Sequence, residues 1–306
     1  MKKHPTYPSK IMLVGEYGVV VGGSALTIPF HKFQAKIRPV SDLPPVKEKD
    51  AEQSLQYIKL LYNYIQKLPA SSFHAPPDMD LFSQNLQTYW LDLDIPVGFG
   101  LGSSGAVSAA LYNIFFPLSG TVTLQQQKED LANIESYFHG KSSGVDALTC
   151  FVRSALRFHT SGKIEKVKFD AMDMPGGYRF FLLNSGEKFD TGPLVKHFLS
   201  QYKNPDFKHS IEEEYLPLNQ KLIETLLGER EADPGLLVRL LSDYQFKHFS
   251  KMIPETMLDL WIEGQVSNEY YLKLNGSGGG FMLGITHQTS MELLEDRWGE
   301  TLIWVE

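Results

Sequence analysis

Residues 96–105, PVGFGLGSSG, have the residue types and spacing of a phosphate-binding loop. Their glycines alternate, two serines follow, and an alanine-rich stretch typical of a helix begins at about Ser103. Such a sequence gathers backbone N–H groups at a helix N-terminus, where the free donors and the helix dipole both favour an anion. The alternative is a tight strand–helix turn capped by Ser103. We expect phosphate groups to be bound by Pro96, Gly98, Gly100, Leu101, Gly102, Ser103, Ser104 and Gly105.

Other common nucleotide and catalytic motifs are absent or incomplete. Gly100, Gly102 and Gly105 match G-x-G-x-x-G, but a dinucleotide site also needs an acidic residue ending a strand about 20 residues later. That distance falls inside a helix expected from about Leu124.

Residues 140–144, GKSSG, contain Gly-Lys-Ser and match G-x-S-x-G. However, Glu135 stands where the phosphate loop G-x-x-x-x-G-K-[ST] needs its first glycine, and a helix expected over 124–138, instead of a strand, precedes the segment. No H-E-x-x-H occurs among the nine histidines. A nucleotide would therefore be bound on a different scaffold.

Elements around this loop follow from hydrophobic spacing. We expect strands over residues 86–95 and within 145–159, with helices over 103–116 and 124–138 between them. The segment at 51–68 has one apolar face and predicts a helix. Short apolar runs at the N-terminus predict a small β-meander, with strands over residues 11–14, 19–21, 25–30 and 33–37.

The second half of the chain also mixes helices and strands. A turn-rich stretch near residues 170–177 is the best candidate for a domain boundary, which divides the chain into domains 1–172 and 173–306. We expect strands over 178–184, 270–274, 280–285 and 301–305, and helices over 193–202, 211–227, 234–252 and 288–298.

Composition excludes several classes of protein. The chain has 306 residues, of which 42% are apolar and 21% charged, as in ordinary globular proteins. Its 29 basic and 36 acidic residues give a net charge of −7, which argues against broad binding to nucleic acids or anionic membranes. A single cysteine, Cys150, cannot form an internal disulfide and fits a reducing compartment. Because no stretch reaches the roughly 18 apolar residues of a membrane span, we expect a soluble, cytoplasmic protein.

Three glycine-rich segments, taken in order, resemble the motifs of the GHMP small-molecule kinases. They read PSKIMLVGEYGVVVGG, PVGFGLGSSGAVSAAL and KLNGSGGGFMLG. Two further segments, ESYFHGKSSGVD and FLLNSGEKFDTGPLV, resemble stretches of the mevalonate kinases within that superfamily. This resemblance implies an α+β fold of two domains. The first would be a ribosomal-protein-like α/β domain and the second a ferredoxin-like α/β sandwich, with ATP and a small alcohol meeting between them.

The resemblance also implies roles for polar residues outside the loop. Asp146 matches the catalytic aspartate of the family and Lys10 its lysine partner. Ser104 and Glu135 match the Mg²⁺ ligands, which are the hard oxygen donors that magnesium prefers. From the residues alone, Glu135 is better interpreted as a solvated helix charge. Lys10 could be a solvated charge before a strand, but Lys10, Glu16 and Asp146 all fall on motif positions, which favours a functional role.

Further positions match the acceptor side and the third motif of the family. Glu16, Tyr17, Ser143 and Thr191 match residues near the phosphates and the substrate, although Thr191 could be a plain loop threonine. Tyr17 stands where mevalonate kinases carry histidine, which leaves the acceptor open. Ser142, Ser277 and Phe281 also depart from the family pattern. The third motif contributes Gly276, Gly278 and Gly279 to the phosphate side.

The function implied is ATP- and Mg²⁺-dependent phosphorylation of a small alcohol, mevalonate first. Phosphomevalonate or a sugar is the alternative acceptor, and a non-catalytic nucleotide-binding regulator is the alternative from another class. The expected partners are ATP and the alcohol, with no nucleic acid and no membrane. A homodimer stays open.

Overall fold

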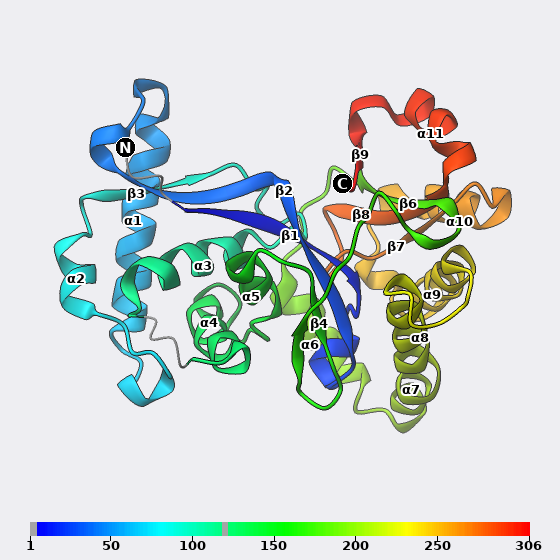
Figure 1. Cartoon of the computed structure of the whole chain (residues 1–306), viewed down its shortest axis with the longest axis horizontal. Helices are drawn as coiled ribbons and strands as arrows, with labels where there is room; N and C mark the ends of the chain where they lie inside the picture. Colours follow the sequence, from blue (N-terminus) through cyan, green and yellow to red (C-terminus); the bar gives the residue numbers. More distant parts are fainter. Residues whose placement is uncertain (1–4, 118–121) are drawn as a thin grey trace. The chain divides into compact units, whose positions relative to one another are not determined.

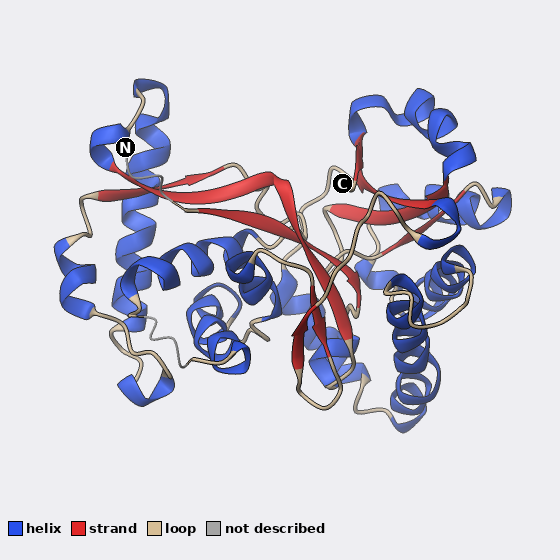
Figure 2. Cartoon of the chain, viewed as in Figure 1, coloured by secondary structure: helices blue, strands red, loops and turns tan. Residues whose placement is uncertain are grey.

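The computed structural model describes residues 5–117 and 122–306. Helices and strands are mixed along the chain, as predicted, and the described strands form two sheets (Figure 2). The chain divides into two compact units. The first unit comprises Met1–Lys10, Pro29–Pro96 and Gly102–Ser154; the second comprises Ile11–Ile28, Val97–Leu101 and Ala155–Glu306. The predicted division between residues 172 and 173 stays a prediction.

The first unit is built mainly from helices. Three of them, α3, α4 and α5, pack against one another, and α1 packs against the strand β3 (Figure 1). β3 pairs in antiparallel fashion with the last five residues of β2. The elements of this unit, besides parts of β1 and β2, are α1 (Glu48–Ile65), α2 (Met79–Gln84), β3 (Tyr89–Leu93), α3 (Ser103–Phe115), α4 (Leu124–His139) and α5 (Val145–Val152).

The second unit contains an antiparallel sheet with the strand order β7-β8-β6-β9. Helices α9 and α10 both pack against β7, and α8 packs against α9. The strands are β4 (Leu156–Phe158), β5 (Ile164–Lys166), β6 (Tyr178–Asn184), β7 (Tyr270–Lys273), β8 (Phe281–His287) and β9 (Leu302–Trp304). The helices are α6 (Thr191–Gln201), α7 (Pro205–Ser210), α8 (Leu216–Leu226), α9 (Pro234–His248), α10 (Leu258–Ser267) and α11 (Met291–Trp298).

Two long strands, β1 (Thr6–Val14) and β2 (Ala25–Pro39), contribute residues to both units. They lie side by side in a second sheet, in which β2 also pairs with β4, and β4 with β5. The predicted meander is wrong in two respects. Residues 25–37 form one strand instead of two, and Gly18–Val21 forms a 3₁₀ helix instead of a strand. Glycines on both sides of that short valine run favour a tight turn over an extended chain.

The expected strand within residues 145–159 is largely a helix. The sequence VDALTCFV forms α5, and only Leu156–Phe158 is a strand. Five of the eight residues of α5 are buried, because the helix packs between α3 and α4. The helix is only eight residues long and six of them are apolar, so its sequence has the length and composition of a buried strand.

The helices can also be compared with what a membrane span requires. In the described part of the chain, no helix combines the length and apolar character that a membrane crossing requires.

Candidate active site

An ion pair in the first unit joins two of the predicted catalytic residues. Nζ of Lys10 lies 3.1 Å from Oδ2 of Asp146. The lysine side chain is 1% exposed and the aspartate side chain 30% exposed, so the carboxylate keeps access to solvent while its partner is buried. Strand β1 carries Lys10, and Asp146 lies in the first turn of α5. The first turn of a helix is a favourable place for a negatively charged side chain.

Ser104 and Glu135, the predicted metal ligands, are in direct contact. Oγ of Ser104 donates to Oε1 of Glu135 at 3.0 Å, and Oγ of Ser142 donates to Oε2 at 2.5 Å. Glu135 is buried on α4. Burial and then the negative charge of Asp146 raise the pKa of Glu135 to about 7, against the effect of its serine hydrogen bonds and of Lys10. A nearby cation would therefore favour the ionised carboxylate.

The phosphate loop enters the first unit at Gly102, which has a φ of 73° and precedes α3. A Cβ atom at this position would lie 2.8 Å from Cγ of Lys10. A glycine is therefore required both by the left-handed backbone and by the lysine that packs against it. At Gly105 a Cβ atom would lie 2.8 Å from the backbone nitrogen of Ala147, so this glycine serves the close packing of α3 on α5.

Other predicted loop residues are distributed over both units. Ser103 begins α3 and is half-buried, whereas the side chain of Leu101 is fully buried and can offer only backbone groups to a ligand. Ser143 is exposed, and its Oγ accepts a hydrogen bond from the N–H of Val145 at 3.4 Å. The structure assigns Gly98 and Gly100 to the second unit, and Pro96 to the first.

In the second unit, Glu16 forms an ion pair with Lys273, and neither side chain is exposed. Nζ of Lys273 also donates to the carbonyl of Leu274 at 2.8 Å. A second route connects the same two segments. The hydroxyl of Tyr215 donates to the carbonyl of Glu16, and Gln245 donates to Tyr215 while accepting from the N–H of Leu274. The first and third motifs are thus tied together by two sets of buried contacts.

Tyr17 is enclosed by aromatic side chains. Its ring centroid lies 4.9 Å from that of Phe198 and 5.3 Å from that of Phe249, and the residue is 4% exposed. Its hydroxyl donates to the carbonyl of Ser277 at 2.5 Å. Burial and the charge of Glu16 raise the pKa of this hydroxyl. Tyr17 also has a φ of 58°, which is uncommon for an aromatic residue.

Thr191 also contacts the third motif. Its Oγ1 lies 2.9 Å from Oγ of Ser277, and it begins α6. The glycines of this motif have positive φ angles and lie in the second unit. They are Gly276, Gly278 and Gly279.

Sequence reasoning missed two residues of these clusters. His139 lies four residues after Glu135 on α4, and its Nε2 is 3.0 Å from Oγ of Ser104. The spacing of four places both side chains on one helix face, which is a signal the sequence contained. Lys273 is the first residue of the third motif, but the sequence gives no sign that Glu16, 257 positions away, is its partner.

The magnesium expectation can be tested on the donor set. Among the described residues, no three His, Cys, Asp or Glu side chains form a metal cluster. Magnesium does not need one, because it is usually held by one or two carboxylates together with phosphates and water. Two ligands about 2.1 Å from Mg²⁺ and at right angles to each other are about 3.0 Å apart. The separation of 3.0 Å between Ser104 Oγ and Glu135 Oε1 fits two such adjacent ligands.

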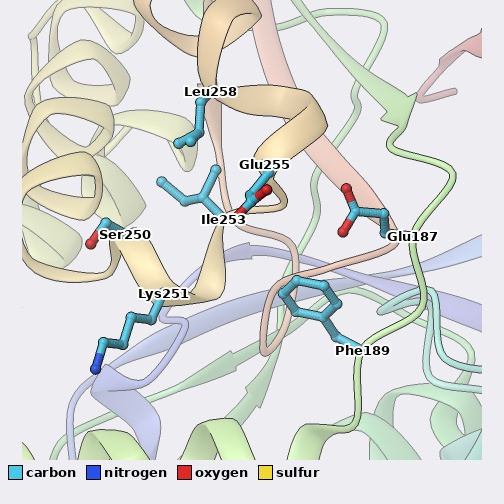
Figure 3. A pocket seen from close by; sticks show the side chains of 7 residues that line it. All are labelled: Glu187, Phe189, Ser250, Lys251, Ile253, Glu255 and Leu258. Carbon is cyan, nitrogen blue, oxygen red and sulfur yellow. The ribbon is translucent and has the colours of Figure 1, made fainter.

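A hollow of about 440 Å³ lies elsewhere in the second unit (Figure 3). Phe189, Ile253 and Leu258 contribute apolar side chains, and Glu187 and Glu255 contribute carboxylates. None of the predicted site residues lines it.

Comparisons with known proteins agree with the motifs. Residues 59–154 match the family described as GHMP kinases N terminal domain. The mevalonate kinase of Pyrococcus horikoshii is 28% identical over 306 residues, covering 89% of this chain and 85% of that protein. The phosphomevalonate kinase of Saccharolobus solfataricus is 28% identical over 236 residues, covering 71% of this chain and 68% of that protein.

The fold has a counterpart among solved structures. The structure of L. major mevalonate kinase in complex with R-mevalonate matches with a TM-score of 0.64, covering 99% of this chain and 95% of that one. At 15% sequence identity, this similarity concerns the fold alone. The family match over residues 59–154, the sequence relatives and the fold agree: the chain is an ATP-dependent small-molecule kinase similar to the GHMP kinases, with mevalonate kinases among its relatives.

Proposed function

We propose that this chain transfers the γ-phosphoryl group of ATP to a small alcohol, with mevalonate as the first acceptor to test. The observation that carries the proposal is the Lys10–Asp146 pair, which lies against Gly102 at the start of α3. It combines a partly exposed carboxylate with a buried ammonium at the end of the phosphate loop. That combination suits a reaction in which an alcohol must lose a proton beside a polyphosphate.

In the proposed reaction, the acceptor oxygen forms a bond to the γ-phosphorus as the bond from phosphorus to ADP breaks. The carboxylate of Asp146 accepts a hydrogen bond from the acceptor hydroxyl and takes its proton. Nζ of Lys10 pairs with that carboxylate and adds positive charge near the transferring group. Backbone N–H groups at the start of α3 bind phosphate oxygens.

Magnesium would supply further positive charge beside the ATP phosphates. Ser104 and Glu135 would hold it, and it would neutralise charge on the β- and γ-phosphates. The residues of the chain then have the task of orientation, because phosphoryl transfer depends mostly on positioning and electrostatic stabilisation.

Support for mevalonate as acceptor comes from the motifs and from the named relatives. Phosphomevalonate is the second candidate, because a phosphomevalonate kinase is related to this chain at the same 28% identity. Tyr17 bears on the choice. Its hydroxyl is engaged with Ser277, so this position does not offer the imidazole that the mevalonate kinases carry there.

The experiment is a coupled assay of ADP release by the purified chain with ATP and Mg²⁺. Mevalonate, phosphomevalonate and a panel of sugars are assayed in parallel. Turnover on mevalonate alone supports the proposal in full. Turnover on another alcohol keeps the kinase and changes the acceptor. Binding of ATP without turnover on any acceptor contradicts the proposal and favours a nucleotide-binding regulator.

A further inference from the structure

A continuous chain of hydrogen bonds surrounds the two candidate magnesium ligands. It runs from Ser142 to Glu135, from Glu135 to Ser104, and from Ser104 to His139. The two oxygens of the Glu135 carboxylate are held by different serines. All four residues belong to the first unit, and two of them are on α4.

The hydroxyl of Ser104 is the central group of this chain. A serine hydroxyl has one proton and two lone pairs. When its proton is donated to Oε1 of Glu135, the N–H at Nε2 of His139 can donate to one lone pair. The second lone pair then remains for a cation, and its direction is set by the other two contacts.

Ser142 fixes the opposite side of the carboxylate. Its Oγ donates to Oε2 of Glu135 and accepts from the N–H of Gly144, and its own N–H donates to Oγ of Ser136. Ser142 is therefore held from both sides, by the last turns of α4 and by the residue before α5. Rotation of the Glu135 carboxylate would break the contacts with both of its serine partners.

We infer that His139 and Ser142 are positioning residues for magnesium: His139 orients the Ser104 hydroxyl and Ser142 orients the Glu135 carboxylate. This inference rests on the proposed function, because it needs a nucleotide-bound Mg²⁺ at Ser104 and Glu135. Neither residue is itself a ligand. Removal of groups that orient metal ligands typically lowers metal affinity about 10–100-fold.

Calorimetry tests the inference without turnover. A non-hydrolysable ATP analogue is titrated into the protein at a series of Mg²⁺ concentrations, which gives the half-saturating Mg²⁺ concentration for binding. We expect His139→Ala and Ser142→Ala each to raise that concentration about 10-fold. His139→Gln should restore most of the affinity, because its amide N–H can reach Ser104.

His74→Ala is the matched control. His74 is an exposed histidine of the same unit, paired with Glu129 near the beginning of α4, and its removal should leave the Mg²⁺ dependence unchanged. A double-mutant cycle gives the second test. If His139 acts through Ser104, then Ser104→Ala combined with His139→Ala binds Mg²⁺ no more weakly than Ser104→Ala alone.

Three results would overturn the inference. They are an unchanged Mg²⁺ half-saturation in both single variants, additive losses in the double variant, or a wild type whose nucleotide binding ignores Mg²⁺. A lower melting temperature with an unchanged half-saturation counts as the first of these, because it indicates a purely structural role. A wild type that binds the analogue with Mg²⁺ but phosphorylates no alcohol contradicts the proposed function alone, and the Mg²⁺ half-saturation of the two variants then still decides the inference.

Discussion

Lys273 and Glu16 form a buried ion pair, in which each residue affects the stability of the chain through its charge. Both side chains have no exposed surface, so each has lost its hydration and depends on contacts within the second unit. A buried pair adds little net stability compared with apolar residues, but the loss of one partner leaves an uncompensated charge. The pair also joins the first and third motifs, so its energetic effect reaches two segments of the candidate site.

Replacement of the lysine should therefore destabilise the chain strongly. We expect Lys273→Met to lower the free energy of unfolding by about 3–5 kcal/mol, measured by urea denaturation. Lys251→Met, which removes an exposed lysine of the same unit, is the control and should change little. Adding Glu16→Gln to Lys273→Met should recover part of the loss, and simple additivity of the two would contradict the coupling.

Asp146 is the residue on which turnover should depend most. We expect Asp146→Asn to reduce the rate of ADP release about 10²–10⁴-fold, because an amide cannot accept the acceptor proton. Nucleotide affinity, measured by calorimetry, should change far less. Asp50→Asn, at an exposed position of α1, provides the control. A variant at Asp146 that retains wild-type turnover would remove this carboxylate from the reaction.

At the scale of elements, the beginning of α3 is defined by what packs against it. Gly102 combines a left-handed backbone with the close approach of Lys10, whereas Gly140, at the end of α4, has a φ of 76° and no atom within 4 Å of a Cβ position. A side chain at either glycine would strain the backbone, but only a side chain at Gly102 would also displace Lys10.

This pair predicts a difference between two alanine variants. Both should lose about 1–2 kcal/mol of stability from the left-handed backbone. Only Gly102→Ala should also reduce turnover strongly, because its methyl group displaces the Lys10 side chain. Urea denaturation and the ADP-release assay measure the two effects. Equal turnover in Gly102→Ala and Gly140→Ala would show that the position of Lys10 does not limit the reaction.

Helix α4 carries its candidate functional residues at one end and its cap at the other. Thr123 and Gln126 form a capping box at the N-terminus. We expect Thr123→Ala to destabilise the chain by about 1 kcal/mol, with little change in the Mg²⁺ dependence of nucleotide binding, because Glu135 lies three turns away. Thermal denaturation and calorimetry test this, with Thr160→Ala at an exposed turn as the control.

Sequence patterns predicted elements whose physical signals are local. The helices α3 and α4 begin at the residues predicted, Ser103 and Leu124. Local signals mark both starts: a glycine precedes α3, and a Thr–Gln capping box opens α4. The strand over residues 178–184 was also predicted with the bounds found. The predictions were wrong where packing against distant parts of the chain determines the secondary structure. The segment of α5 was predicted as a strand but is buried as a helix between two others, and the helix Leu258–Ser267 was not predicted at all.

At the scale of the whole molecule, ligand binding should appear as stability. A ligand that binds only the folded state at about 100 times its dissociation constant adds about 2.7 kcal/mol to the free energy of unfolding. We therefore expect ATP with Mg²⁺ to raise the thermal transition, and removal of Mg²⁺ with EDTA to reverse most of that rise. A transition that responds to neither addition would contradict nucleotide binding.

Contacts between residues distant in sequence were only partly predictable at this scale. The motif order indicated that Lys10 and Asp146 act together, and the structure brings them to 3.1 Å; their catalytic roles stay predictions. Periodicity and composition cannot identify such partners, because they describe only neighbours along the chain. The aromatic enclosure of Tyr17 and its contact with Ser277 were unpredictable for the same reason.

Strands β1 and β2 and the loop around Gly102 each pass between the two compact units, so neither unit is a single stretch of chain. A gene divided after residue 172 would leave Ile11–Ile28 on the first fragment, although those residues belong to the second unit. The first fragment would then contain all of the first unit, but the second fragment would lack Ile11–Ile28, Val97–Leu101 and residues 155–172 of the second unit. The second fragment should consequently be poor as a separately expressed protein, but the two fragments should suit a split reporter, in which activity returns only when both are brought together in one cell.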